Sequence, residues 1–258
     1  MRDRLTKALP PVLSFAAVLL VWQGMVWVFR PPPFLLPGID RVAERLVTFG
    51  ANWPKHIVAT VESIVLGFAV AAVFGVAGAV VIVYSESLRR ALTPLLVTLQ
   101  IIPKIAFAPL ILVWFGVGLT SKVTVAFLVA FFPVLINTAV GLVQVEPDLL
   151  DLARSIKAPA TWVFFRIRFP NSLPYFFAGL RVASTLAVIG AIIGEFVASD
   201  VGLGYLIVIA NNQMDTALGI ASIFLVSVIG LVLYGAILAI ERVCTPWAAA
   251  EGGLQAMV

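Results

Sequence analysis

The chain has 258 residues, of which 62% are hydrophobic and only 12% are charged, and its mean hydropathy is +1.10. So few charges cannot cover the surface of a water-soluble domain of this size, so the composition indicates an integral membrane protein and excludes a soluble enzyme or binding domain. With Cys244 and His56 as the single cysteine and histidine, a disulfide framework and a Cys/His metal cluster are excluded as well.

Six apolar stretches are long enough to cross a bilayer as helices, which takes about 20 residues each. They are residues 8–29, 57–84, 91–115, 123–144, 175–198 and 217–240. No small-residue cleavage site follows the first stretch, so we interpret it as a retained anchor and not as a signal peptide. The sequence therefore predicts an all-α transmembrane fold of about six helices, in a single domain over residues 1–258.

The distribution of basic residues predicts the orientation, because cytoplasmic connections carry an excess of Lys and Arg. With a cytoplasmic N-terminus, eleven of the 17 basic residues lie in cytoplasmic connections, and Lys104 lies inside a span. The outer connections hold five, namely Arg30, Arg41, Arg45, Lys55 and Lys122. We therefore expect both termini in the cytoplasm, and we attribute the net charge of +4 to topology and not to nucleic-acid binding.

Two outer connections are expected to contain short helices. In the first, a proline-rich start leads into an amphipathic helix with Val42, Leu46 and Val47 on its apolar side. We interpret this helix as lying on the membrane surface, with docking of a partner as the alternative. In the connection before the last span, Gly202 and Gly204 permit a sharp turn ahead of a short apolar helix.

Prolines and glycines inside the spans predict kinks and close packing. Spans three and four contain Pro94, Pro103, Pro109 and Pro133. Each removes one backbone hydrogen bond and can kink its helix. Small packing surfaces between helices are expected at Gly67, Gly75, Gly78, Gly190 and Gly194.

The cytoplasmic connection 145–174 contains the segment "DLARSIKAPATWVFFRIRFP", which is rich in basic residues and prolines. Pro147 fits the first turn of a helix, where its missing N–H costs nothing. The residues that follow place four apolar side chains on one helical face, Leu149, Leu152, Ala153 and Ile156. Pro159 should end this helix. We expect a second short helix over about 161–168, ended by Pro170 and Pro174 before the chain returns to the membrane.

This segment resembles the coupling-helix signature of permease subunits in ATP-binding-cassette (ABC) importers, which reads Glu-Ala-Ala, three residues, Gly, nine residues, then Ile-x-Leu-Pro. Asp151, Leu152 and Ala153 stand at the Glu-Ala-Ala positions, Lys157 at the Gly, and Ile167, Phe169 and Pro170 at Ile, Leu and Pro. Lys157 departs from the pattern, because a side chain at a left-handed turn costs about 1 kcal/mol. Either the turn differs here or the chain bears this strain.

The resemblance extends over nearly the whole chain, through "IIPKIAFAPLILVWFG", "FFPVLINTAVGL", "LPYFFAGLRVAST", "AIIGEFVAS" and "GLGYLI". These blocks are similar to the branch that serves nitrate, sulfonate, taurine and thiamine-precursor or riboflavin importers. The resemblance implies a type I importer permease in the inner (cytoplasmic) membrane, in contact with lipid. It also implies two ATPase subunits, a second copy of this permease or a paralogue, and a periplasmic or lipoprotein substrate-binding protein.

The chain has no phosphate-binding loop of the form G-x-x-x-x-G-K-[ST], so we expect ATP to be bound and hydrolysed by a separate polypeptide. A short helix held by prolines would then fit a cleft on that ATPase. Leu149 and Leu152 would supply apolar area, Ala153 close approach, and Asp151 a charge pair. No catalytic residue, metal or cofactor is expected in this chain.

Lys104 and Glu195 are charged residues inside the third and fifth expected spans. A charge in the hydrocarbon is costly, so such residues usually face a cavity or a partner. We hypothesise that they line or brace the translocation pathway, separately or as a pair. The alternatives are a structural salt bridge and, for Glu195 near the outer end of its span, a side chain that extends to the interface.

The sequence leaves the solute open. Lys104 suggests an anion such as a sulfonate or nitrate, whereas "FFP" and "PYFFAGL" resemble more closely the pyrimidine-precursor and riboflavin members, which we favour. Two other functional classes fit the sequence less well. An ion-coupled secondary transporter would carry more intramembrane acids, and a membrane-embedded enzyme would need catalytic side chains that the spans lack.

Overall fold

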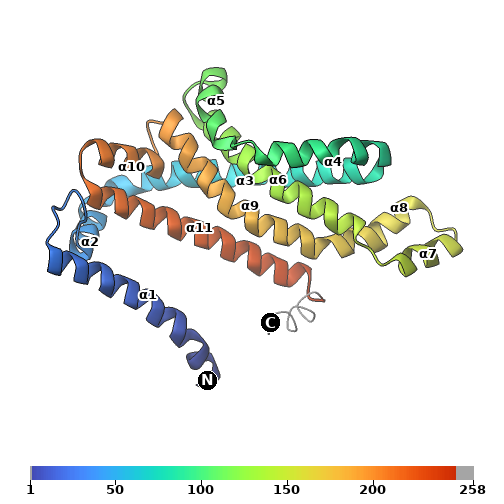
Figure 1. The fold of residues 1–258 in the computed structure, drawn as a ribbon, viewed down its shortest axis with the longest axis horizontal. Coiled ribbons are helices and arrows are strands. Elements are labelled where there is room, and N and C mark those ends of the chain that lie inside the picture. The colour runs from blue at the N-terminus through green and yellow to red at the C-terminus, as the bar shows by residue number, and fades with distance from the viewer. Residues whose placement is uncertain (1, 248–258) are drawn as a thin grey trace.

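The computed structural model describes the backbone of residues 2–247, and within it every side chain except those of residues 2–12, 86–89, 92, 93, 97 and 100. Residues 1 and 248–258 of the predicted domain lie outside the described residues. So do the side chains of Arg2, Arg4, Lys7 and Arg89, which contribute to the predicted orientation. Every regular element in the described range is helical, as the sequence predicts (Figure 1).

The elements follow one another as helices joined by short connections. In chain order they are α1 (Arg2–Phe29), α2 (Ile39–Thr48), η1 (Gly50–Asn52), α3 (Trp53–Tyr84), α4 (Glu86–Ile101), η2 (Lys104–Phe107), α5 (Ala108–Phe115), α6 (Leu119–Val143), α7 (Pro147–Ser155), α8 (Ala160–Val163), η3 (Phe164–Arg168), α9 (Phe169–Ala198), α10 (Leu203–Asn212) and α11 (Thr216–Cys244). Four helical segments are long and apolar enough to cross a membrane, namely Gly50–Tyr84, Leu119–Val143, Ala160–Ala198 and Thr216–Cys244. They correspond to the second, fourth, fifth and sixth expected spans.

Helices α3, α6, α9 and α11 run along the length of the molecule, and α1 lies at its edge (Figure 1). The backbones of α6 and its neighbours approach closely because glycines face them. A Cβ placed on Gly190 of α9 would lie 2.7 Å from Ala126 Cα, and one on Gly75 of α3 would lie 2.8 Å from Val134 Cβ. Both distances are shorter than van der Waals contact, so the prediction that these glycines are packing surfaces is confirmed.

The third expected span, 91–115, is not a continuous helix. The chain breaks between Ile101 and Lys104, so that α4, η2 and α5 form three separate pieces. Pro103 lies at the break with ψ of 93°, and proline both lacks the N–H of a helical hydrogen bond and disfavours the helical region for the residue before it. The 16 residues of α4 reach only about 24 Å, short of the ~30 Å hydrocarbon core.

The expectation that Pro170 and Pro174 end a short helix before the membrane is wrong. Helix continues from Ala160 to Ala198 over 39 residues. The five residues before α9, Phe164–Arg168, form a π-helical turn, which widens the helix. Because the ring of a helical proline collides with the carbonyl four residues earlier, this wider turn lets Pro170 follow without a break.

Helix α2 packs against protein, at the opposite end of the molecule from α7 (Figure 1). Val42 is buried in one cluster with Leu203 and Leu206 of α10 and Leu218 of α11. Val42 and Leu46 of α2 are therefore covered by α10 and α11, which differs from the expectation of a helix that lies on the membrane surface, whereas Val47 of the same expected side is 79% exposed. The charged side of α2 remains exposed at this end of the bundle.

Candidate functional site

Helix α7 projects from the end of the bundle and presents large apolar side chains. Pro147 stands at its first turn, as expected from the missing N–H. Leu149, Leu152 and Ile156 are 44%, 61% and 63% exposed. Asp151 and Arg154 on the same helix form an exposed ion pair of 2.9 Å. The helix thus offers an apolar surface beside a pair of charges, outside the packed bundle.

Ala153, unlike the three exposed residues, is covered by the rest of the chain. It is only 3% exposed and lines a pocket of about 320 Å³ together with Tyr84 of α3 and Arg168. Helical spacing puts Ala153 beside Leu149, so Ala153 forms the covered edge of the face that the sequence predicts, and the other three residues form its exposed part. Its small size serves the packing of α7 against the rest of the chain.

Lys157 adopts the left-handed conformation, with φ of 52°. Of the two alternatives, a different turn or a strained one, the structure therefore has the strained turn. The end of α7 has the two hydrogen bonds of a Schellman motif. Ala158 N–H donates to Ala153 O at 2.9 Å, and Lys157 N–H donates to Arg154 O at 2.9 Å. Glycine is the preferred residue at this position because it has no Cβ. The turn is therefore that of the family pattern, with lysine in place of glycine.

The base of the loop is held by residues that sequence reasoning missed. Asn171 Nδ2 donates to Gln144 O at 2.8 Å, and Arg168 Nη1 donates to Leu142 O at 2.8 Å. These bonds join the C-terminal end of α6 to the junction of η3 and α9, on either side of the loop. They satisfy carbonyls that a helix end leaves without partners. Pro170 lies between the two donors, as the second residue of α9.

Lys104 follows the break at Pro103 and lies against α6. Its Nζ is 4.8 Å from the centre of the Phe132 ring, a cation–π contact. Both residues line a pocket of about 320 Å³ that also includes Asn137 of α6 and Leu186 of α9. The break in the third segment therefore brings a cation, an aromatic ring and an amide to one recess.

Glu195 is 1% exposed and lies at the junction of α3, α9 and α10. Its carboxylate accepts hydrogen bonds from Thr60 Oγ1 at 2.8 Å and from Gly204 N–H at 2.7 Å. A Cβ on Gly202 would overlap this carboxylate, so the glycine allows α10 to approach it. The side chain points into protein, and the alternative that it extends to the membrane interface is wrong.

Lys122 is a further buried charge near Glu195. It was counted among the outer basic residues, yet it is 4% exposed within α6. Its Nζ donates to Ser199 Oγ at 3.4 Å, and it interacts electrostatically with Glu195. Sequence reasoning missed this residue because Lys122 stands next to the expected edge of a span, where an exposed lysine is common.

The structure does not bring Lys104 and Glu195 together. Lys104 shares its pocket with Leu186 of α9, and Glu195 lies nine residues further along the same helix, about 14 Å away. The hydrogen bonds of Glu195 come from Thr60, Ser63 and Gly204. Within the described part of the chain, no group of three or more His, Cys, Asp or Glu residues could hold a metal ion.

Comparison with known proteins agrees with this architecture. Residues 63–243 match the family described as "Binding-protein-dependent transport system inner membrane component". The chain is 35% identical to the formylaminopyrimidine transport permease protein ThiX of Halalkalibacterium halodurans, over 93% of this chain and 96% of that protein. It is 37% identical to the riboflavin transport system permease protein RibX of Chloroflexus aurantiacus, over 92% and 89%. It is 27% identical to the taurine transport system permease protein TauC of Escherichia coli, over 91% and 88%.

The family match covers most of the chain, and the relatives are permeases of ABC importers along nearly their whole length. They give no support to an ion-coupled secondary transporter. The helical fold, the four long apolar segments and the projecting loop helix fit the same assignment. The chain belongs to the family of inner membrane permease components of binding-protein-dependent ABC importers.

Proposed function

We propose that this permease is driven by a separate ATPase subunit that binds α7 through Leu149, Leu152 and Ile156. The exposed apolar side chains of α7 carry this proposal. Three large apolar residues gathered on a projecting helix are a typical contact surface for a partner. Asp151 and Arg154 lie at the edge of this surface and fit a polar rim.

The same proposal gives the arrangement of the importer. Two ATPase subunits bind two permease chains, the second being another copy or a paralogue, and a substrate-binding protein delivers the solute from outside. The end of the bundle with α7 and both termini then face the cytoplasm. ATP is bound by the ATPase, and this chain needs no catalytic site, metal or cofactor of its own.

Arginine in place of Leu152 tests the docking surface. It puts a charge where the ATPase would cover an apolar side chain, so Leu152→Arg should abolish co-purification of the ATPase in mild detergent. Val47→Arg adds the same charge at a residue of α2 that is 79% exposed, at the other end of the molecule, and should leave co-purification intact. If the ATPase binds both variants equally, α7 is not its docking helix.

For the solute, we propose a planar nitrogen heterocycle of the formylaminopyrimidine or riboflavin type. Two observations support it. Permeases of these two solutes are 35% and 37% identical to this chain, against 27% for the taurine permease. The pocket at Lys104 also combines the Phe132 ring with the Asn137 amide, groups that can stack on and hydrogen-bond to such a ring.

A small anion such as taurine or nitrate is the second candidate, favoured by the charge of Lys104. A permease for nitrate from Synechocystis is 33% identical over 93% of this chain. Competition separates the two classes. Uptake of labelled riboflavin or formylaminopyrimidine by vesicles containing the whole importer should resist excess taurine and nitrate. Uptake of labelled taurine or nitrate, with none of the heterocycles, would replace the first candidate with the second.

A further inference from the structure

The pocket beside Ala153 opens between the end of α3 and the loop that carries α7 and α8, at one end of the molecule (Figure 1). We call it the α3–α7 pocket. Its volume is about 320 Å³, and its lining includes Tyr84 of α3, Arg154 of α7 and Arg168 of η3. Among the described residues that line it, the two charged ones are both arginines, and the others apart from Tyr84 are apolar. The pocket therefore suits an anion.

The ends of the long apolar helices place this pocket at the edge of the hydrocarbon. Helix α3 ends at Tyr84, which lines the pocket together with Arg168. Arg168 Nη1 in turn donates to Leu142 O at 2.8 Å, next to the last residue of α6. The segment Ala160–Ala198 has 39 residues, about twice the number needed to cross the hydrocarbon, so its first turns extend beyond it. The pocket thus lies at the level of the lipid head groups.

Exposed aromatic side chains beside the pocket agree with this level. Trp162, Phe165 and Phe169 are exposed on the segment that follows α7, and Tyr84 is exposed at the end of α3. The rings of Tyr84 and Phe164 lie 5.5 Å apart, which joins the two groups. Aromatic residues gather at membrane–water interfaces, where an apolar ring and a polar group are both accommodated. The α3–α7 pocket is therefore bordered by surfaces that contact lipid.

Arg168 is the cation best placed to hold an anion in this pocket. Its side chain is half-buried, and its hydrogen bond goes to a neutral carbonyl, Leu142 O. Within the described part of the chain, no carboxylate forms an ion pair with it. A guanidinium carries five N–H donors in a planar fork, so the bond to Leu142 leaves most of them for a second acceptor. Its charge and its remaining donors are available to a phosphate.

Arg154 adds a second cation to the pocket. It pairs with Asp151 at 2.9 Å, but the two side chains are 78% and 68% exposed. An ion pair as exposed as this one contributes little free energy, because water competes for both partners. Arg154 can therefore reorient toward an anion in the pocket at little cost.

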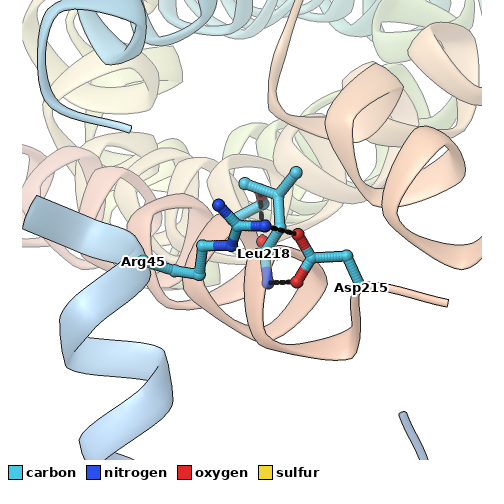
Figure 2. Close-up of polar contacts among 4 residues, drawn as sticks. Arg45, Asp215 and Leu218 are labelled. Carbon is cyan, nitrogen blue, oxygen red and sulfur yellow. Dashed lines mark hydrogen bonds and ion pairs between the residues drawn. The ribbon is translucent and has the colours of Figure 1, made fainter. Parts of the chain in front are cut away.

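The larger recess at the other end of the molecule differs in charge. Its volume is about 640 Å³, and its lining includes Arg41 and Arg45 together with Glu44 and Asp215. These four charges balance, and Arg45 is held by Asp215 in an ion pair of 2.6 Å (Figure 2). An excess of positive charge thus distinguishes the α3–α7 pocket from this recess.

We propose that the α3–α7 pocket binds the phosphate of an anionic phospholipid, with Arg168 as its main contact and Arg154 and Tyr84 as further donors. Arginine binds phosphate oxygens through two parallel N–H bonds, and basic pockets between transmembrane helices bind anionic head groups. The acyl chains of the lipid leave the pocket along Trp162 and Phe165. A free phosphate ion has the same charge chemistry, but it would leave these apolar side chains uncovered, so the exposed aromatic surface favours a lipid.

The lipid site and the ATPase surface lie on different parts of α7. Ala153 forms the covered edge of the helix and lines the pocket, whereas Leu149, Leu152 and Ile156 are exposed. A bound lipid therefore leaves the proposed ATPase surface accessible and supports the covered edge. The lipid site requires only that this end of the bundle meets a membrane surface, so it does not depend on the ATPase proposal.

Native mass spectrometry of the full chain, released from a neutral detergent, tests this site by counting bound phospholipids. Phosphatidylglycerol should bind with an apparent Kd at least about tenfold lower than that of phosphatidylcholine, whose head group has no net charge. Arg168→Gln keeps a donor for Leu142 O and removes the charge. It should raise the Kd for phosphatidylglycerol about tenfold or more, as loss of a charge-assisted hydrogen bond does. Arg166→Gln removes an exposed arginine outside the pocket lining and should change the Kd less than about twofold.

Two further measurements separate the alternatives. Should Arg168→Gln fail to fold, Arg154→Gln changes an exposed side chain and should raise the Kd about threefold or more. Excess inorganic phosphate should not displace the lipid, because it lacks the acyl chains. Displacement by phosphate would replace the lipid with a free anion as the occupant. Equal affinity for the two phospholipids, or equal Kd values for the Arg166 and pocket arginine variants, would overturn the site and leave the ATPase proposal intact.

Discussion

Replacing Glu195 by leucine tests whether its buried carboxylate holds α3, α9 and α10 together. The carboxylate accepts hydrogen bonds from Thr60 Oγ1 at 2.8 Å and from Gly204 N–H at 2.7 Å. Hydrogen bonds to a charged group contribute about 1.5–3 kcal/mol each. The leucine would also leave Gly204 N–H buried without this acceptor, and an unsatisfied buried donor costs about 1–3 kcal/mol. From the loss of these hydrogen bonds we expect Glu195→Leu to lower the free energy of unfolding by about 3–5 kcal/mol.

Thermal unfolding in detergent measures this loss. For a chain of this size, 1 kcal/mol shifts the Tm by about 2–4 °C, so Glu195→Leu should unfold about 6–20 °C below the wild type. Glu195→Gln keeps an acceptor oxygen and should lose about half as much. Glu62→Gln, at an exposed glutamate of α3, is the matched control and should stay within about 2 °C. A Tm for Glu195→Leu equal to that of the control would refute the role given to this carboxylate.

Three further substitutions have definite expected outcomes. Lys157→Gly should raise the free energy of unfolding by about 1 kcal/mol, measured as a higher Tm, because glycine fits φ of 52° without strain; a lower Tm would contradict the turn. Gly190→Val should lower the Tm by several degrees and reduce the yield of folded protein, since its side chain would collide with the backbone at Ala126; an unchanged Tm would show that α6 and α9 are not so close. Lys104→Met should raise the KM for solute uptake at least about fivefold with little change in Tm, because it removes the cation over Phe132; unchanged uptake would remove Lys104 from the pathway.

The long spans were predictable because hydropathy over some 20 residues is a local property. The exceptions come from prolines, whose effect depends on what surrounds them. Pro103 breaks the third segment, whereas Pro170 and Pro174 lie within a continuous helix. The difference lies in the π-helical turn before Pro170, which sequence periodicity does not reveal. A proline in the sequence therefore marks a possible helix break, and the surrounding structure determines whether the helix breaks there.

In the candidate site, too, some features were predictable from the sequence and others only from the fold. The exposed residues of α7 were predictable from helical spacing, because Leu149, Leu152 and Ile156 recur at three and four residues. Spacing could not show which side of so short a helix is covered by the rest of the chain, and Ala153 is on that covered side. Glu195 was found as an intramembrane charge, whereas its partners come from helices distant in sequence, so only the fold reveals them.

The continuous helix from Ala160 to Ala198 has a mechanical consequence. Its 39 residues extend over about 58 Å, from the loop that carries α7 to the buried cluster at Glu195. At that cluster the helix is bonded to α10, because Gly204 N–H donates to the Glu195 carboxylate at 2.7 Å. A rigid helix transmits displacement along its axis, whereas two short helices separated by a proline break would absorb it. One helix thus connects the loop that carries α7 with the buried cluster at Glu195, so a movement of α7 when the ATPase binds can reach the opposite end of the bundle.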